Sequence, residues 1–364
     1  MVFEGMNPAS GKRSLCDGFE QLIFCNDPSV GLKAIISMHS TVLGPATGGC
    51  RMWTYASEQE AFTDVLRLSK GMTYKAAISG LNWGGGKAVI IGNPKTDKRE
   101  GIFEKFGEYV DKLGGNYVTA KDVGIGADDL KRIKSKTSHV LGIEGEAGSS
   151  GDPSPATAWG VFHGIKACVK KVFGTSSLSG RKIALQGLGS VNYYLLEHLM
   201  AEGASVIGCD IDQAMLDRAV MKYRIETVNP DAIYDVPCDI FAPGALGAVI
   251  NTKTLSRLKT KIIAGAANNQ LATSEDGYEV TKRGMIYAPD YAINAGGLIN
   301  IYYEGVAQGG YSKARAYEHV SRIENIIGDI LDRAEAENLP THIIADRIAE
   351  ERVEQARRGQ IQTR

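Results

Sequence analysis

The chain has 364 residues, with 41 lysines and arginines against 42 aspartates and glutamates. This length suffices for about two domains, and the near-zero net charge argues against a nucleic-acid or membrane-surface partner. No apolar run approaches the roughly 18 residues of a membrane span, and the N-terminus lacks the pattern of a signal peptide, so we expect a cytoplasmic protein. The six cysteines form no CxxC pair, so neither a metal site nor a disulfide framework is predicted.

In the first part of the chain, strand-like and helix-like segments alternate. The predicted strands are 32–39, 87–92 and 116–124, and the predicted helices are 58–79 and 100–114. A stretch rich in Gly, Ser and Pro follows at 145–162, and we interpret it as a hinge. We place the domain boundary just before it, with a first α/β domain over 1–142.

After the hinge, strands and helices alternate more regularly. The predicted strands are 181–187, 204–212, 238–243, 260–267 and 284–289, with a helix at 190–203. This alternation predicts a parallel, doubly wound sheet of the Rossmann type over 143–335. The remaining C-terminal residues are predicted to be helical.

A glycine-rich turn lies between the predicted strand at 181–187 and the helix that follows it. Gly187 suits the tight turn, and Gly189 lets the backbone approach a pyrophosphate at the helix N-terminus. Asn192 occupies the third position, where the dinucleotide-binding fingerprint has glycine or alanine. Taken alone, such a turn is a plain strand-to-helix connection as often as it is a dinucleotide-binding turn. Asp210 ends the next strand, at the position where a carboxylate binds the ribose of NAD. No Lys or Arg stands beside it to bind the 2′-phosphate of NADP, so NAD is the predicted cofactor. The predicted NAD contacts are Gly187, Leu188, Gly189, Ser190, Val191, Asn192 and Asp210.

Lys87 follows three glycines and precedes an apolar run. The segment is not a phosphate-binding loop, because Leu81 and Ala88 stand where that motif requires glycine and serine or threonine. A lysine among glycines and apolar side chains loses solvation, so we expect its pKa to fall and the side chain to transfer protons. We interpret the glycines as clearing room for a substrate carbon.

Two further charged residues fit the same chemistry. Lys75 shares a predicted apolar helix face with Leu68, Met72 and Ile78. Burying its charge there costs free energy unless an anion pairs with it. The alternative is that Lys75 lies at the end of this apolar face and is solvated. Asp122 ends a predicted strand and either caps a turn or handles the protons of an amine. With NAD, two lysines and an aspartate suit oxidation of an amino acid to an imine and its hydrolysis.

Eight ordered motifs resemble those of the leucine dehydrogenases in the glutamate/leucine/phenylalanine/valine dehydrogenase superfamily. They are LGPATGGCRMWTY, KGMTYKAAISGLNWGGGK, NYVTAKDVG, GSSGDPSPATAWGV, QGLGSV, CDIFAPGALGAVIN, IIAGAANNQL and YAPDYAINAGGLIN. The resemblance implies a substrate-binding and oligomerisation domain, an NAD-binding domain and a cleft between them. It also implies that the C-terminal helix, 336–364, packs back on the first domain, and that the chain forms a homo-oligomer, an octamer or a dimer. Residues 1–15 match no motif.

The resemblance also implies residue roles. Lys87 matches the catalytic acid/base that activates water at the imino carbon, and Asp122 matches the aspartate that assists proton transfer at the amino group. Thr157 matches a contact of the nicotinamide region. The substrate carboxylate is expected to bind Lys75, with the backbone at Gly48 and Gly49 and the side chain of Asn268.

Four positions are expected to shape the pocket for the substrate side chain: Thr47, Ala120, Leu298 and Ile301. Glutamate enzymes carry lysine where Thr47 stands, so a substrate carboxylate would be left unpaired here. Ala120 is typical of the leucine branch, whereas Leu298 resembles the phenylalanine branch and Thr47 replaces the usual leucine. We predict a branched-chain substrate, L-leucine first, then Val and Ile. The alternatives are an aromatic (Phe or Trp) amino acid dehydrogenase and a catalytically inactive dinucleotide-binding regulator.

Overall fold

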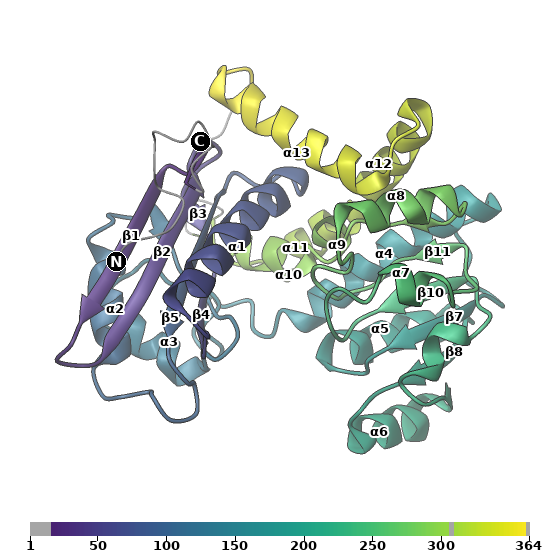
Figure 1. Cartoon of the computed structure of the whole chain (residues 1–364), viewed down its shortest axis with the longest axis horizontal. Coiled ribbons are helices and arrows are strands. Elements are labelled where there is room, and N and C mark those ends of the chain that lie inside the picture. The colour runs from purple at the N-terminus through teal and green to yellow at the C-terminus, as the bar shows by residue number, and fades with distance from the viewer. Residues whose placement is uncertain (1–15, 306–308, 362–364) are drawn as a thin grey trace. The chain divides into compact units, whose positions relative to one another are not determined.

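The computed structural model describes residues 16–305 and 309–361, which form two compact units. The first comprises Met1–Gly151 with Ala349–Arg364, and the second is Asp152–Ile348 (Figure 1). The sequence placed the boundary at 142/143 and assigned all of 336–364 to the first domain. In the structure the division falls later at both places. Residues 336–348 belong to the second unit, where for example the Thr341 hydroxyl donates to the carbonyl of Tyr287 at 2.6 Å.

The first unit is built on a mixed sheet of order β1-β2-β5-β3-β6, with β4 beside β5. β2 is antiparallel to both β1 and β5, while β3 and β4 run parallel to β5. After β6, the segment pairs with its neighbours through isolated bridges, at Thr119 and Lys121. The strand predicted at 116–124 is therefore much shorter in the structure. The strands are β1 (Gln21–Asp27), β2 (Leu32–Ser40), β3 (Ala46–Thr47), β4 (Cys50–Trp53), β5 (Gly84–Ile91) and β6 (Tyr117–Val118).

Helices cover both faces of this sheet. Alternate residues such as Ile36 and Ala88 pack against α2 (Ile102–Asp111) and α3 (Ala127–Lys134). The intervening residues, such as Ile35 and Val89, pack against α1 (Glu58–Ile78), which runs alongside the strands in Figure 1. Lys87 therefore lies on the α1 face of β5.

Helix α1 has a defined beginning and end. The Ser57 side chain accepts from the backbone N–H of Glu60, and acidic residues occupy the first turn, where they complement the helix dipole. At its C-terminal end, Arg352 of α13 (Thr341–Arg357) donates to the carbonyls of Ala77 at 2.9 Å and Leu81 at 2.8 Å. Arg352 thus adds a side-chain donor to one carbonyl in the last turn of α1 and to one in the turn that follows the helix.

The second unit contains a parallel sheet of order β12-β11-β10-β7-β8-β9, which confirms the predicted doubly wound architecture. The chain order reverses beside β7, and such a switch point is where open α/β sheets bind ligands. The strands are β7 (Lys182–Gln186), β8 (Ser205–Cys209), β9 (Glu226–Thr227), β10 (Ile240–Pro243), β11 (Ile262–Ile263) and β12 (Ile286–Tyr287).

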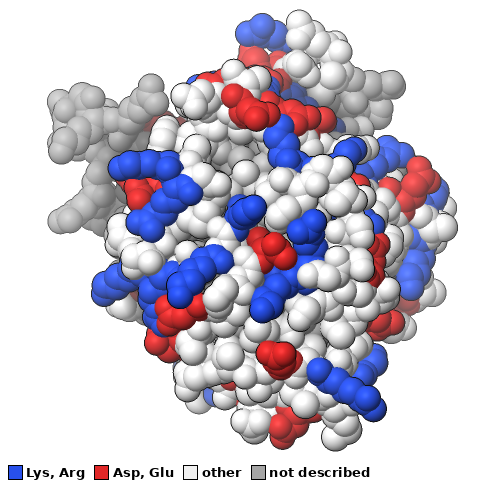
Figure 2. All heavy atoms as spheres, turned by 90° about the vertical axis from the view of Figure 1, so that its right-hand side faces the viewer, with Lys and Arg blue, Asp and Glu red and all other residues white. Residues whose placement is uncertain are grey.

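Helices before, between and after these strands complete the second unit. They are α4 (Ser154–Phe173), α5 (Ser190–Ala201), α6 (Gln213–Tyr223), η2 (Ala232–Asp235), α7 (Thr252–Leu255), α8 (Ser274–Lys282), α9 (Asp290–Ile293), α10 (Gly296–Tyr302), α11 (Lys313–Ser321) and α12 (Ile323–Glu337). In the described ranges no helix is long and apolar enough to cross a bilayer. The face seen in Figure 2 intersperses basic with acidic side chains.

Candidate active site

An ion pair joins two of the predicted catalytic residues. Lys87 Nζ lies 2.6 Å from Asp122 Oδ2, and the two side chains are 9% and 20% exposed. Arg51 Nε donates to the same carboxylate oxygen at 3.3 Å. Burial raises the pKa of Asp122, but the charges of Lys87 and Arg51 outweigh it, so this pKa lies below its usual range. The site therefore holds an ionised carboxylate between two cationic side chains.

The three glycines before Lys87 have a packing role. A Cβ on Gly85 would lie 2.1 Å from the backbone nitrogen of Thr73 in α1, and one on Gly84 would lie 1.9 Å from the carbonyl oxygen of Ser40. A Cβ on Gly86 would meet the ring of Tyr117 at 2.8 Å. The interpretation that these glycines clear room for a substrate carbon is therefore wrong, because protein atoms already occupy that space.

Gly48 and Gly49 cross between Lys87 and Asp122. A Cβ on Gly49 would lie 2.9 Å from Cβ of Asp122, so its absence lets the carboxylate approach the lysine. The carbonyl of Gly48 accepts a hydrogen bond from the hydroxyl of the fully buried Tyr117 at 2.7 Å. Because a peptide unit is planar, this bond also fixes the direction of the Gly49 N–H group.

Lys75 lies near the C-terminal end of α1 and is half-buried. The buried face of this helix runs through Phe62, Val65, Ser69, Thr73 and Ala76. Leu68 and Met72 are only half-buried, so the predicted stripe that they form with Lys75 is the margin of the buried face. Met72 nevertheless approaches Gly48: its Cγ would lie 3.3 Å from a Cβ placed there.

Two predicted pocket residues lie on the strands beside this site. Thr47 ends β3 and is buried, and its hydroxyl donates to the carbonyl of Pro45 at 3.1 Å. Ala120 is also buried, and its carbonyl accepts from the backbone N–H of Cys50 at 2.9 Å. Since the Thr47 hydroxyl already has an acceptor, this position offers a substrate mainly its methyl group.

The second unit carries the predicted dinucleotide turn after β7. Gly187 has φ +83°, a conformation that favours glycine, and its N–H donates to the carbonyl of Cys209 at 2.8 Å. Gly189 is the N-cap of α5, without a side-chain cap, and a Cβ added to it would meet no protein atom within 4 Å. The first turn of α5, with Ser190 and Val191, therefore offers uncapped N–H groups and open space, as a pyrophosphate requires.

Asn192, which departs from the fingerprint, is integrated into the turn. It is buried, and its Nδ2 donates to the carbonyls of Gly187 at 2.7 Å and Gln186 at 3.3 Å. Gly244 follows β10 on the opposite side of the switch point, and a Cβ there would lie 1.9 Å from Nδ2 of Asn192. The larger side chain is thus accommodated by a glycine elsewhere in the chain.

Asp210 braces the same turn. Its Oδ2 accepts from the backbone N–H of Leu188 at 2.6 Å, and its Oδ1 accepts from that of Asp212 at 2.8 Å. Each carboxylate oxygen can accept more than one hydrogen bond, so the group retains capacity for a ribose hydroxyl.

The other predicted residues also lie in the second unit. Leu298 and Ile301 are half-buried and three residues apart on α10, so they share one face. A Cβ on Gly297 would lie 2.7 Å from Oγ1 of Thr157, so the start of α10 packs closely on Thr157. The exposed Asn268 accepts through Oδ1 from Asn294 Nδ2 at 2.7 Å. These four residues and the lysines thus belong to different units of the chain.

Two polar residues of the site were not predicted from the sequence. Arg51 stands two residues after Gly49, in the segment GGCR. Because successive side chains of a strand point to opposite faces, this spacing could have indicated that Arg51 lies on the same face as the site. Tyr117 begins the segment predicted as a strand, but nothing local indicates that its hydroxyl reaches Gly48.

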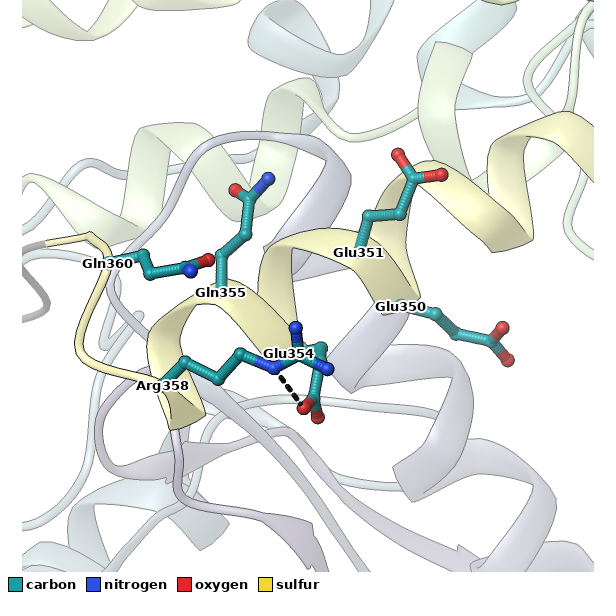
Figure 3. Close-up of a pocket in the computed structure, with 6 residues that line it drawn as sticks. All are labelled: Glu350, Glu351, Glu354, Gln355, Arg358 and Gln360. Carbon is teal, nitrogen blue, oxygen red and sulfur yellow. Dashed lines mark hydrogen bonds and ion pairs between the residues drawn. The ribbon is translucent and has the colours of Figure 1, made fainter.

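A surface hollow of about 460 Å³ lies elsewhere, on α13 and the turn after it. As Figure 3 shows, Arg358 and Glu354 lie together there, and Arg358 Nε donates to Glu354 Oε1 at 2.8 Å. None of the predicted site residues lines this hollow, so we do not assign the chemistry to it. Its lining is Glu350, Glu351, Glu354, Gln355, Arg358 and Gln360.

A lysine–aspartate pair in one α/β unit and a dinucleotide turn on a parallel sheet in the other define an NAD-dependent amino acid dehydrogenase. Residues 19–139 match the family described as "Glu/Leu/Phe/Val dehydrogenase, dimerisation domain". Residues 148–219 and 211–360 match "Glutamate/Leucine/Phenylalanine/Valine dehydrogenase". The chain belongs to this family, and its first domain implies a homo-oligomer.

Three relatives illustrate the similarity. The leucine dehydrogenase of Thermoactinomyces intermedius is 51% identical over 93% of this chain and 92% of its own length. The phenylalanine dehydrogenase of Bacillus thermotolerans is 45% identical over 92% of this chain and 88% of its own. The crystal structure of L-tryptophan dehydrogenase from Nostoc punctiforme superimposes with a TM-score of 0.82 at 40% identity, covering 93% of this chain and 97% of that one. The predicted family, enzyme class and cofactor are confirmed.

Proposed function

We propose that the protein catalyses the reversible oxidative deamination of L-leucine, and of Val and Ile, with NAD. In this reaction the amino acid, NAD⁺ and water yield the 2-oxo acid, ammonium, NADH and a proton. The observation that carries the proposal is the contact of Lys87 Nζ with Asp122 Oδ2 at 2.6 Å, with both side chains largely buried. This contact gives the site an ammonium donor and a carboxylate acceptor in one place.

Each of the two residues has a defined proton task. Asp122, whose pKa is lowered chiefly by Lys87 and Arg51 against the effect of burial, is ionised and accepts a proton from the substrate ammonium group. Bound NAD would supply the acceptor for the hydride that leaves the substrate Cα. Lys87, after its own ammonium proton has left to solvent, takes a proton from the water that attacks the imino carbon and returns it to the departing nitrogen.

Binding is assigned to the remaining predicted residues. Lys75 meets the substrate carboxylate, together with the N–H group of Gly49 and the amide of Asn268. The expected contribution of the Gly48 N–H is not supported, because that group donates to the carbonyl of Val118 at 3.1 Å. The turn from Gly187 to Asn192 holds the pyrophosphate on the first turn of α5, and Asp210 accepts from the ribose. Thr157 contacts the nicotinamide region. Supporting the nucleotide assignment, Gly189 has no protein neighbour within 4 Å of a Cβ position.

A branched-chain substrate is supported by the chemistry of the pocket residues. Thr47 uses its hydroxyl internally, Ala120 is buried, and Leu298 and Ile301 add an apolar face on α10. These groups suit an apolar side chain and offer no cation for a glutamate side chain. The higher identity to a leucine dehydrogenase than to aromatic amino acid dehydrogenases supports L-leucine as the first choice.

We also propose an octameric or dimeric assembly in the cytoplasm. Cys25, Cys50 and Cys168 are free thiols buried in the protein, which suits a reducing compartment.

The experiment is a comparison of NADH formation from NAD with L-Leu, L-Val, L-Ile, L-Phe, L-Trp and L-Glu at alkaline pH, where proton release favours deamination. We expect kcat/KM to be highest for Leu, followed by Val and Ile. Turnover confined to Phe or Trp would establish the aromatic alternative. Absence of turnover in a protein that still binds NADH would establish the regulator.

A further inference from the structure

Within the first unit, a series of alternating positive and negative side chains extends from the pair Lys87 and Asp122. Asp122 Oδ2 forms ion pairs with Lys87 Nζ at 2.6 Å and with Arg51 Nε at 3.3 Å. The Nη1 atom of Arg51 donates to Oδ2 of Asp64, in α1, at 3.0 Å. The Arg51 side chain is 22% exposed and Asp64 is 15% exposed. The guanidinium thus links the catalytic carboxylate to a second carboxylate on a helix.

Asp64 is itself held firmly. The Tyr55 hydroxyl donates to its Oδ2 at 2.8 Å, and Arg67 Nη2 donates to its Oδ1 at 3.1 Å. These groups border a surface hollow of about 420 Å³, which Glu60 also lines. The Cys50 thiol and the Tyr117 hydroxyl are buried titratable groups that interact with Asp122; burial raises the pKa of each well above its usual value, so both stay neutral. Asp64 can therefore fix the orientation of the Arg51 fork.

The two cations on Asp122 differ in chemistry. The lysine must gain and lose a proton during deamination, whereas a guanidinium stays charged throughout the accessible pH range. When Lys87 is neutral, Arg51 is the remaining cation in contact with the carboxylate among the described residues. A planar fork with several donors can also hold two carboxylates at once, which a single ammonium group cannot do as well.

We propose that Arg51 is a positioning residue that keeps the Asp122 carboxylate ionised and directed at Lys87 while the lysine changes protonation state, with Asp64 anchoring the arginine. This inference rests on the proposed roles of Lys87 and Asp122. Arg51 does not touch the reacting atoms and acts through Asp122.

The test compares Arg51→Gln and Arg51→Lys with wild type, using Lys98→Met as a matched control. Lys98 forms an ion pair with Asp129 in the same unit, away from Asp122. We expect Arg51→Gln to lower kcat by about tenfold or more, within the range of a general acid–base contribution. Its kcat/KM profile should also move to higher pH, because loss of a cation raises the pKa of Asp122. Arg51→Lys should lower kcat but move the profile less, since the charge remains. Thermal unfolding shows whether each variant is folded.

A double-mutant cycle separates this role from plain structural support. If Arg51 acts through Asp122, Arg51→Gln should reduce kcat far less in an Asp122→Asn background than in wild type. Equal losses in both backgrounds, or a pH profile that matches the Lys98→Met control, would overturn the inference while leaving the proposed function intact. A wild-type protein without dehydrogenase activity would instead refute the proposed function, and that assay comes first.

Discussion

Lys87 Nζ and Asp122 Oδ2 lie 2.6 Å apart on either side of a segment that has no side chain at Gly49. The lysine comes from the interior of β5, and the aspartate comes from the segment beyond β6. Strands β3 and β4 pair with β5. Gly49, which lies between these two strands in the sequence, must be small for Asp122 to contact Lys87. The proposed catalytic pair is therefore a product of sheet topology.

Replacing Lys87 with methionine should abolish catalysis and leave the cofactor bound. General acid–base groups contribute about 10²–10⁴ in rate, so we expect kcat to fall by at least that factor. NADH binding should persist, because the dinucleotide turn belongs to the other unit. Steady-state kinetics and NADH fluorescence titration measure the two effects. Lys121→Met is the control, since Lys121 is an exposed neighbour paired with Glu144. Equal activity in the two variants would contradict the assignment.

The lowered pKa of Asp122 predicts a pH-dependent contribution to stability. Lys87 and Arg51 lower this pKa against the effect of burial, so the stabilisation is present above the unfolded pKa of about 3.9 and is lost as pH falls through the lower folded pKa. Thermal unfolding of wild type and Asp122→Asn should therefore differ most near neutral pH and converge in acid. A difference in melting temperature that does not change with pH would mean that Asp122 carries no such linkage.

Gly189→Ala should separate folding from cofactor binding. Gly189 has φ −62°, and a Cβ there would meet no protein atom within 4 Å, so alanine fits the folded chain. If a pyrophosphate occupies that space, the methyl group should weaken NADH binding by about tenfold or more, which corresponds to about 1.4 kcal/mol. Gly328→Ala, on α12 and equally uncrowded, is the matched control. Unchanged NADH affinity in Gly189→Ala would place the cofactor elsewhere.

Thr47→Leu should sharpen the preference for aliphatic substrates. The larger side chain fills space beside the buried end of β3, so we expect kcat/KM to fall more for Phe than for Leu. A change of this size in an apolar pocket alters discrimination by about 1–3 kcal/mol. Thr47→Val, which keeps the shape and removes the hydroxyl, should leave the ratio nearly unchanged. A Leu-to-Phe ratio that is the same in all three proteins would remove Thr47 from the pocket.

Tyr117→Phe should weaken substrate binding more than it slows chemistry. Loss of the hydroxyl removes the 2.7 Å hydrogen bond to Gly48 and frees the peptide that presents the Gly49 N–H group. A buried hydrogen bond contributes about 0.5–1.5 kcal/mol, so the KM for the amino acid should rise by roughly two- to tenfold. Tyr109→Phe removes an exposed hydroxyl bonded to Asn26 and serves as control. A fall in kcat at constant KM would contradict this role.

Much of the architecture could be read from local patterns. The helix at 58–79 and the strand at 32–39 agree closely with α1 and β2, because apolar periodicity reports which face is buried. The strand at 116–124 was too long because its pairing ends after Val118, and pairing depends on a distant partner that a local pattern does not contain.

The site shows the same limit. Lys87 and Asp122 could be proposed from residue type and motif, but the role of the glycines at 84–86 could not. Their purpose depends on Thr73, Ser40 and Tyr117, which are remote in the sequence. Asn192 and Gly244 are likewise separated by 52 positions, yet each residue type is explained only by its contact with the other. Arg51 was missed because its two carboxylate partners lie on different elements.

The contact of Arg352 with the end of α1 also has a consequence for how the two units can be separated. Arg352 lies 271 positions after Leu81, and the whole second unit stands between them in the sequence. A fragment that stops at Gly151 therefore contains the carbonyls of Ala77 and Leu81 but not the guanidinium that donates to them. The first unit is completed by a segment from beyond the second, so no single cut of the chain releases it with these hydrogen bonds intact.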